Sequence, residues 1–455
     1  MSDPYTAPAS SGASIVRGSL ISLGVRLLDL PSRYGFHLLV AVALGVVQTG
    51  NFYIVFSTMA ALAGFGRLGI DQALTRQIAI DVASGRSMAV RATIRRALAL
   101  VLLASVTVSV LLAASAAMLA QHVLNKPELA WPLVLGALAF VPQNVCAAFA
   151  GALAGLQRVG LSQMIYSWLW PAIFCIAAIP LEVTGGLTVV YALILIAASY
   201  VVTALVGAIL LKRALDAMPA HAASATVTSV TSAPRLLKPG LSLFGLEFTK
   251  LLITSAPAIV LGIVATSRET GLFALAWRLA LVVNLLISGV TGMAAPRFAS
   301  LYARHDLPGL QRSAAQAVGI VLCLSLPLTA CMLLFPERLL ALFGTGYGAG
   351  AATLRILALG QFAAACFTAM PELLGMTAHT SVLYRINFYS VAALLIGLAV
   401  LAPLCGSVGA AAAASLAVVV NGVIAAWAAH RLLGVAPLAA LWSGLTARVS
   451  RSARS

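Results

Sequence analysis

The sequence contains few charged residues and is particularly short of acidic ones. Asp, Glu, Lys and Arg make up 9% of the 455 residues, of which only 12 are Asp or Glu, whereas hydrophobic residues make up 61%. The mean hydropathy is +1.03. No polar stretch is long enough to form a separate folded domain. This composition predicts an integral membrane protein and excludes an ordinary soluble one.

The sequence also lacks the common motifs of catalysis and metal binding. It contains no GxxxxGK[ST], no HExxH and no paired CxxC, so we expect no ATP hydrolysis, no cofactor and no enzymatic activity. The six cysteines lie in or beside apolar runs without the spacing of metal ligands, which is typical of small buried side chains. They are Cys146, Cys175, Cys323, Cys331, Cys366 and Cys405.

Apolar segments of membrane-spanning length recur along the whole chain. They predict an all-α membrane protein with twelve transmembrane helices. The expected spans are residues 17–44, 50–66, 97–119, 131–155, 161–181, 187–211, 239–264, 271–295, 314–335, 350–371, 381–402 and 408–429. The second is short, so we expect Arg67 to mark an interface and the helix to continue beyond it.

The basic residues are distributed unequally between the two sides of these spans. Of the 28 Lys and Arg, 19 lie in the even-numbered connections and the two termini, and three lie in the odd-numbered connections. Cytoplasmic loops carry such an excess, so the pattern predicts that both termini lie in the cytoplasm. The net charge of +16 therefore reflects topology, and we expect no nucleic acid as a partner.

The twelve spans divide into two halves of six. We expect an N-terminal lobe over residues 1–212, a flexible cytoplasmic linker over 213–238 and a C-terminal lobe over 239–433. The basic tail 434–455 has the spacing of a short interfacial helix, with a frayed end as the alternative. Thr49-Gly50 recurs as Thr270-Gly271 after 221 residues, one of several matches that favour a parallel internal repeat.

The first span carries an unusual polar stripe. Spacings of three and four residues place six polar side chains on one face of a helix. They are Ser19, Ser22, Arg26, Asp29, Arg33 and His37. Each charged residue at mid-bilayer costs about 2.5–3.5 kcal/mol on insertion scales. We therefore expect this stripe to face water, partner charges or a charged cargo, and not lipid.

Other spans also carry charged residues. Lys250 and Arg278 are cationic and Glu247 is acidic, whereas Arg355 and Arg385 lie near span ends and are interpreted as anchors. When these anchors are left out, the charges expected near the midplane are four cations and two carboxylates. A water-filled cavity of that sign favours an anionic cargo.

Three apolar stretches that contain glycine and arginine residues carry a family resemblance. They are LGIDQALTRQIA from Leu68, GALAGLQRVG from Gly151 and LFGTGYGAGAATLRILALGQ from Leu342. With the length and the 6+6 repeat, they make the chain resemble the Wzx-type polysaccharide flippases of the multidrug/oligosaccharidyl-lipid/polysaccharide (MOP) exporter superfamily.

The resemblance implies two lobes that rock in alternating access around a central cavity lined by spans 1, 2, 7 and 8. The implied cargo is an undecaprenyl-pyrophosphate-linked oligosaccharide, moved to the periplasmic leaflet of the bacterial inner membrane for exopolysaccharide or O-antigen synthesis. Polysaccharide polymerase and other assembly proteins are the implied partners. Carried over by position, Arg26, Arg33, Lys250 and Arg278 would bind the substrate.

Two other functions fit the architecture. A multidrug exporter of the MATE kind, coupled to an ion gradient, has the same architecture, but its usual cargo is a lipophilic cation, for which the excess of cations has the wrong sign. The other is a structural or scaffold role, which does not explain the charged stripe of the first span.

The repeat suggests a role for the two acidic residues. Shifted by 221 residues, Arg26 and Asp29 map onto Glu247 and Lys250 with their signs exchanged. We hypothesise that Arg26 pairs with Glu247, and Asp29 with Lys250, across the lobe interface when no cargo is bound. Asp29 and Glu247 would then serve gating or proton coupling. The alternative is that Arg26 pairs with Asp29, and Glu247 with Lys250, within each helix.

The charge distribution makes the topology testable. Single cysteines at Ser224 and Ser452, in a cysteine-free background, should react with a membrane-impermeant reagent only from the cytoplasmic side. Labelling of either position in intact cells would contradict the predicted topology and, with it, the parallel repeat.

Overall fold

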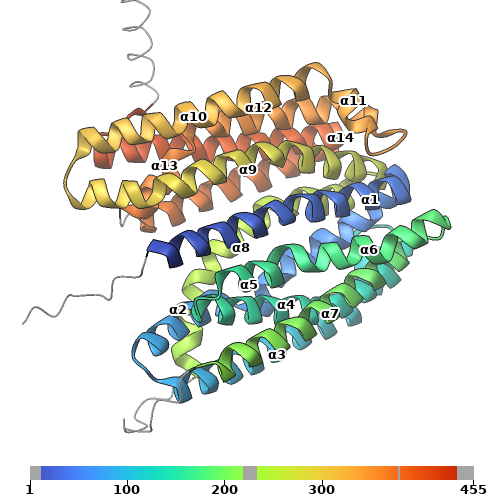
Figure 1. Ribbon diagram of the computed structural model, residues 1–455. Coiled ribbons are helices and arrows are strands. Elements are labelled where there is room, and N and C mark those ends of the chain that lie inside the picture. The colour runs from blue at the N-terminus through green and yellow to red at the C-terminus, as the bar shows by residue number, and fades with distance from the viewer. Residues whose placement is uncertain (1–11, 219–232, 378–379, 438–455) are drawn as a thin grey trace, which may run out of the picture. The chain divides into compact units, whose positions relative to one another are not determined.

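The computed structural model describes residues 12–218, 233–377 and 380–437. These residues form helices joined by short turns, with no strand in the ranges given (Figure 1). The all-α fold predicted from the sequence is confirmed. The centre of the predicted linker, residues 219–232, and the tail from residue 438 lie outside the described residues, as do Ser224 and Ser452.

The first half of the chain contains the helices α1 to α7. A π-helical turn over Leu119–Val123 and a 3₁₀ turn over Pro127–Leu129 connect α3 to α4. A second π-helical turn, Met164–Trp168, joins α5 to α6 so that they form one span. The helices are α1 (Gly12–Arg67), α2 (Ile70–Ala83), α3 (Ser87–Met118), α4 (Ala130–Gly155), α5 (Val159–Gln163), α6 (Leu169–Val183) and α7 (Val189–Asp216).

The second half contains the helices α8 to α14. A 3₁₀ turn over Tyr347–Gly350 precedes α12. The helices are α8 (Ala233–Val264), α9 (Ser267–Ala303), α10 (Leu307–Leu334), α11 (Pro336–Ala341), α12 (Ala351–Phe367), α13 (Ala369–Met376) and α14 (Thr380–Leu433).

Ten helical segments of the described chain are long and apolar enough to cross a membrane. Two of these are double-length and contain a break, one at Gly45 (φ 67°) and one at Gly406 (φ 55°). Glycine adopts these left-handed conformations without the steric cost that a Cβ imposes. Each break turns one continuous helix into two spans, so the described residues supply the twelve spans that the sequence predicts.

The end of the second span differs from the expectation that its helix continues beyond Arg67. The helix ends at Arg67, the chain turns through positive φ at Leu68 (51°) and Gly69 (66°), and α2 begins as a separate helix. Arg67 is buried, donates to the carbonyl of Ala63 and lies 3.9 Å from Asp71. Two successive left-handed residues cannot continue an α-helix, and this is why the continuation is a new element.

The described chain divides into two compact units that do not coincide with the two sequence halves. The first unit comprises the described residues up to Ala43, together with Leu62–Leu119 and Glu128–Gly245. The second comprises Leu44–Ala61, Ala120–Pro127 and the described residues from Leu246 onward. The later part of α1 and the α3–α4 connection therefore pack with the second half of the chain.

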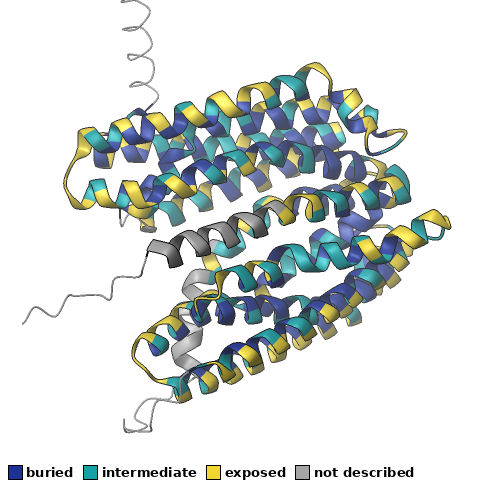
Figure 2. Ribbon diagram, viewed as in Figure 1, coloured by how far each residue is buried: buried dark blue, intermediate teal, exposed yellow. Residues whose placement is uncertain are grey.

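Each unit has a central helix. In the first unit α4 packs against α2, α3 and α7, and in the second α12 packs against α9, α10 and α14. The outward-facing sides of the surrounding helices are exposed (Figure 2), and they carry large apolar residues such as Leu103 and Leu111 on α3 and Ile320 and Leu326 on α10. Exposed apolar surface of this extent suits contact with lipid.

A close crossing of α1 and α9 within the second unit depends on the repeated glycines Gly50 and Gly271. A Cβ on Gly50 would overlap the carbonyl of Ser267, and a Cβ on Gly271 would overlap the carbonyl of Val46. Gly50 on α1 and Gly271 on α9 therefore occupy equivalent positions at the crossing. This reciprocal contact is what a two-fold repeat produces, and small residues are the means by which membrane helices approach closely.

Two polar contacts lie near this crossing in sequence. The hydroxyl of Tyr347 donates to the hydroxyl of Thr49 over 2.9 Å. The ammonium of Lys126 donates to the carbonyls of Gly262 (2.5 Å) and Ala265 (3.1 Å) at the C-terminal end of α8. A cation at that end of a helix satisfies carbonyls that lack intrahelical partners and interacts favourably with the helix dipole.

Gly271→Ala should destabilise the protein because the added methyl group requires α1 and α9 to separate. Overpacking of this kind costs about 1–3 kcal/mol, so the midpoint of thermal unfolding of the purified protein should fall. Gly289→Ala is the matched control on the same helix, since a Cβ there meets nothing within 4 Å. Equal midpoints for the two variants would contradict the crossing.

Candidate transport site

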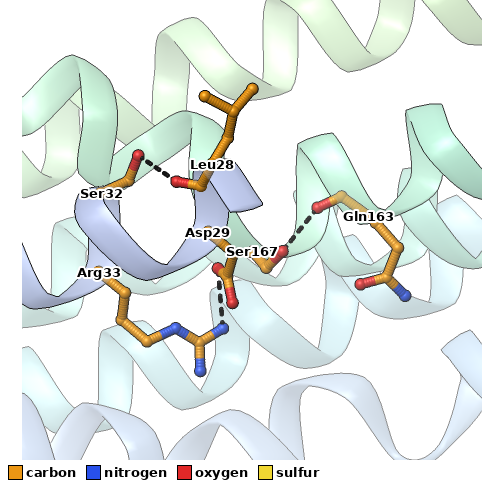
Figure 3. A network of polar contacts seen from close by, with 6 residues as sticks. All are labelled: Leu28, Asp29, Ser32, Arg33, Gln163 and Ser167. Carbon is orange, nitrogen blue, oxygen red and sulfur yellow. Dashed lines mark hydrogen bonds and ion pairs between the residues drawn. The ribbon is translucent and has the colours of Figure 1, made fainter. Parts of the chain in front are cut away.

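Asp29 and Arg33, in the first span of α1, form an intrahelical pair. The guanidinium of Arg33 donates to the carboxylate of Asp29 over 3.2 Å, and their side chains are 48% and 22% exposed. Figure 3 shows the guanidinium turned toward the carboxylate, one helical turn away. The sequence predicts Arg26 or Lys250 as the partner of Asp29, whereas Arg33 is its partner here. The side chain of Arg26 lies outside the described residues.

Aromatic packing anchors the next turn of α1. Phe36 is fully buried, and its ring lies 5.1 Å from that of Trp170 and 4.8 Å from that of Phe174, both on α6. His37 is buried and packs edge-on against Phe36 at 5.0 Å. This packing sets the rotation of α1. His37 is consequently enclosed by protein while Arg33, one turn earlier, is half-exposed.

The charged residues of α8 lie on a more open helix. Lys250 is exposed and Glu247 is partly exposed. The two form no ion pair with each other or with another residue that the structure describes. Thr254, which is the counterpart of Arg33 in the repeat, donates to the carbonyl of Lys250 and is uncharged. An unpaired cation on a spanning helix is available to an anion.

Arg278 on α9 is in contact with an aromatic ring. Its guanidinium lies 5.6 Å from the centre of the ring of Tyr53, which is buried on α1. The Nε atom of Arg278 is buried and has no hydrogen-bond partner in the described part of the chain. A cation–π contact of this kind contributes about 0.5–2 kcal/mol and orients the charge without neutralising it.

These cations lie at the middle depth of their own helices. At 1.5 Å per residue, Arg33 is about 18 Å from the break at Gly45, and Lys250 is about 21 Å from the C-terminal end of α8. Arg278 is about 17 Å from the start of α9. The hydrocarbon core is about 30 Å thick, so each of these distances is more than half of that thickness.

Arg355 and Arg385, interpreted as anchors from the sequence, each lie near the start of a helix. Arg355 pairs with Glu337 at 3.1 Å and donates to the carbonyl of Leu333, with both charged side chains about half-exposed. This contact agrees with its interpretation as an anchor. Arg385 is exposed near the start of α14.

Sequence reasoning missed Tyr53 as the partner of Arg278. The two residues are far apart in the chain, and tyrosine in an apolar segment gives no pattern of its own. The available signal was the repeated pair Thr49-Gly50 one turn earlier, which marks this part of α1 as a contact region.

The fold is shared with known transporters. The chain is similar to a MATE-family multidrug transporter of the MOP superfamily in its inward-facing conformation, with a TM-score of 0.72, 16% identity and coverage of 88% of this chain and 94% of that one. It is also similar to the lipid II flippase MurJ in its inward closed conformation, with a TM-score of 0.67, 12% identity and coverage of 91% and 87%.

A third similar structure is a MOP-superfamily transporter from Pyrococcus furiosus, described as having a binding pocket of reversed polarity. Its TM-score is 0.65 at 16% identity, with coverage of 90% of this chain and 94% of that one. A search of curated proteins finds no match.

These similarities show that the chain has the fold of MOP-superfamily transporters. Residues 15–302, more than half of the chain, match the model of one family. The chain therefore belongs to the polysaccharide biosynthesis protein family, which includes the Wzx-type flippases. Proteins of this family and fold are transporters and flippases.

Proposed function

We propose that this protein moves an undecaprenyl-pyrophosphate-linked oligosaccharide from the cytoplasmic to the periplasmic leaflet of the bacterial inner membrane. Arg26, Arg33, Lys250 and Arg278 bind the pyrophosphate, and the protein works by alternating access. Polysaccharide polymerase and other assembly proteins are its expected partners. Membership of the polysaccharide biosynthesis family supports the class of cargo.

The observation that carries this proposal is the set of cations at mid-depth. Lys250 has no ion-pair partner within the described ranges, and Arg33 is half-exposed beside a single carboxylate. Arg278 is oriented by a neutral ring. Charges left in this state at the centre of a spanning helix are costly. A pyrophosphate group offsets that cost through charge-assisted hydrogen bonds, which arginine forms as a bidentate fork.

The alternative is a MATE-like multidrug exporter, which the fold similarity favours. An exporter of lipophilic cations needs acidic residues that are free to attract them. Asp29, however, is neutralised by Arg33. Of the two acidic residues assigned to the site, Asp29 and Glu247, only Glu247 remains without a counter-ion among the described residues, so the sign of the site favours the anionic cargo.

Loss of the proposed binding cations should abolish polysaccharide export without loss of the protein. Each charge-assisted hydrogen bond is worth about 1.5–3 kcal/mol. Arg26→Ala, Arg33→Ala and Lys250→Ala should therefore each reduce surface polysaccharide about tenfold or more, at unchanged protein level in the membrane. Arg26→Lys and Arg33→Lys should be partly tolerated because a point charge still attracts phosphate.

Arg385→Ala provides the control, since it removes an exposed arginine near the end of a span. It should leave export unchanged. Normal polysaccharide together with altered resistance to cationic dyes in the three alanine variants would reverse the choice in favour of the drug exporter.

We further propose that Asp29 and Glu247 gate the transporter. In the empty protein, Arg26 pairs with Glu247 and Asp29 with Lys250 in one conformational state. The cargo phosphate then competes for the cations. The carboxylate freed in this way accepts a proton and so couples transport to the proton gradient. The Asp29–Arg33 pair provides a second partner for Asp29 in the alternate state.

A charge-swap cycle tests the gate. Arg26→Glu alone should abolish export, and the added Glu247→Arg should restore part of it. Restoration by Asp29→Arg instead would show that Arg26 pairs within its own helix. The gate is rejected if neither double variant recovers activity although both are stably inserted.

A further inference from the structure

A cavity lies at one end of the first unit, and none of the proposed transport cations lines it. Its volume is about 290 Å³, and its walls come from the α2–α3 turn, the α4–α5 turn and the end of α7. Arg86 and Arg158 supply the charge in its lining, while Val82, Leu156, Ala217 and Met218 supply apolar surface. It lies at the ends of spanning helices, so it opens at the level of the membrane surface.

Ion pairs fix the walls of this cavity. Arg86 donates to the carboxylate of Asp81 over 2.9 Å, and Asp81 is almost fully buried. Arg91 donates to the carbonyl of Leu215 (3.0 Å) and to the carboxylate of Asp216 (3.4 Å), which ties α3 to the end of α7. The surroundings of the two lining arginines are therefore built from buried and cross-helix contacts.

The lining carries an excess of positive charge. None of its residues is acidic. The nearest carboxylates, Asp81 and Asp216, are each engaged by an arginine. Arg158 is exposed and forms no ion pair with any residue that the structure describes. Arg86 uses one of its terminal nitrogens for Asp81, so its remaining N–H groups are free to donate.

The repeat offers a comparison within the same chain. In the second half, Asp306 caps the corresponding helix α10 by accepting from the backbone N–H of Gly309 over 2.8 Å. In the first half, the residue at that position before α3 is Arg86, and no side chain caps the helix. The second half thus has an internal anion where the first has a cation beside a cavity.

We propose that this cavity binds the phosphate group of an anionic membrane lipid. The guanidinium groups of Arg86 and Arg158 donate to the phosphate oxygens. Val82, Leu156 and Met218 contact the glycerol and the first methylene groups of the acyl chains. The site is separate from the transport cations, and the bound lipid joins the ends of α2, α4 and α7. It therefore stabilises the first unit in proportion to the anionic lipid in its leaflet.

The full-length protein in neutral detergent provides a direct test. Phosphatidylglycerol and phosphatidylcholine are titrated separately, and the bound lipid is counted by native mass spectrometry. Phosphatidylglycerol should bind more tightly. Arg158→Gln should weaken it about tenfold, the equivalent of one charge-assisted hydrogen bond. Arg304→Gln, an exposed arginine at the end of α9, should bind as the wild type does.

A second variant separates occupation of the cavity from general surface charge. Ala217→Trp fills the cavity from its exposed rim without a change of charge. It should weaken phosphatidylglycerol binding while leaving the thermal midpoint in lipid-free detergent near that of the wild type. Equal binding of the two lipids, or wild-type binding by both Arg158→Gln and Ala217→Trp, would overturn the proposal.

Inorganic phosphate distinguishes the source of the phosphate group. If the ligand is a lipid, millimolar phosphate should not displace phosphatidylglycerol. Displacement that depends on Arg158 would assign the same cavity to a soluble phosphate and reject the lipid. The measurement is of binding and not of export, so it is independent of the proposed cargo.

Discussion

An ionised side chain at the centre of a bilayer is costly unless protein, water or cargo supplies counter-charge. This constraint governs the arrangement of the charges in the described chain. Asp29 and Arg33 neutralise each other on α1, and Arg278 rests on the ring of Tyr53. Lys250 has neither kind of partner in the residues described. Lys250 and Arg278 keep a positive charge that no carboxylate in the described chain pairs, against one such carboxylate, Glu247, and this excess of cations is the basis of the proposed anionic cargo.

The same constraint explains why the architecture could be predicted from the sequence. The length of an apolar segment is a local property, so twelve spans follow from counting residues. At Gly45 and Gly406 a single residue takes the place of the loop expected between two spans. Each break lies where the preceding apolar segment has reached the length of one span. The end of α1 at Arg67 was missed because a left-handed Leu68 is imposed by its surroundings and not by any preference of leucine.

The site was predictable only in part. Charged residues in apolar segments are conspicuous, so Arg33, Lys250 and Arg278 could be selected from the sequence. Their partners could not be, because the contact between Tyr53 and Arg278 joins distant parts of the chain. The choice between Arg26 and Arg33 as the partner of Asp29 depends on rotamers, since both lie within one helical turn of it.

The internal repeat is retained where backbones touch and lost at the residues that we propose to bind ligands. Gly50 and Gly271 occupy equivalent places at one crossing because only glycine fits there, so neither position can diverge. Polar positions have no such restriction. Asp306 caps α10 whereas Arg86 precedes α3, and Arg33 has Thr254 as its counterpart. In a duplicated fold, packing positions are thus constrained in pairs, whereas polar and charged positions can differ between the two copies. The candidate sites are therefore asymmetric although the fold is repeated.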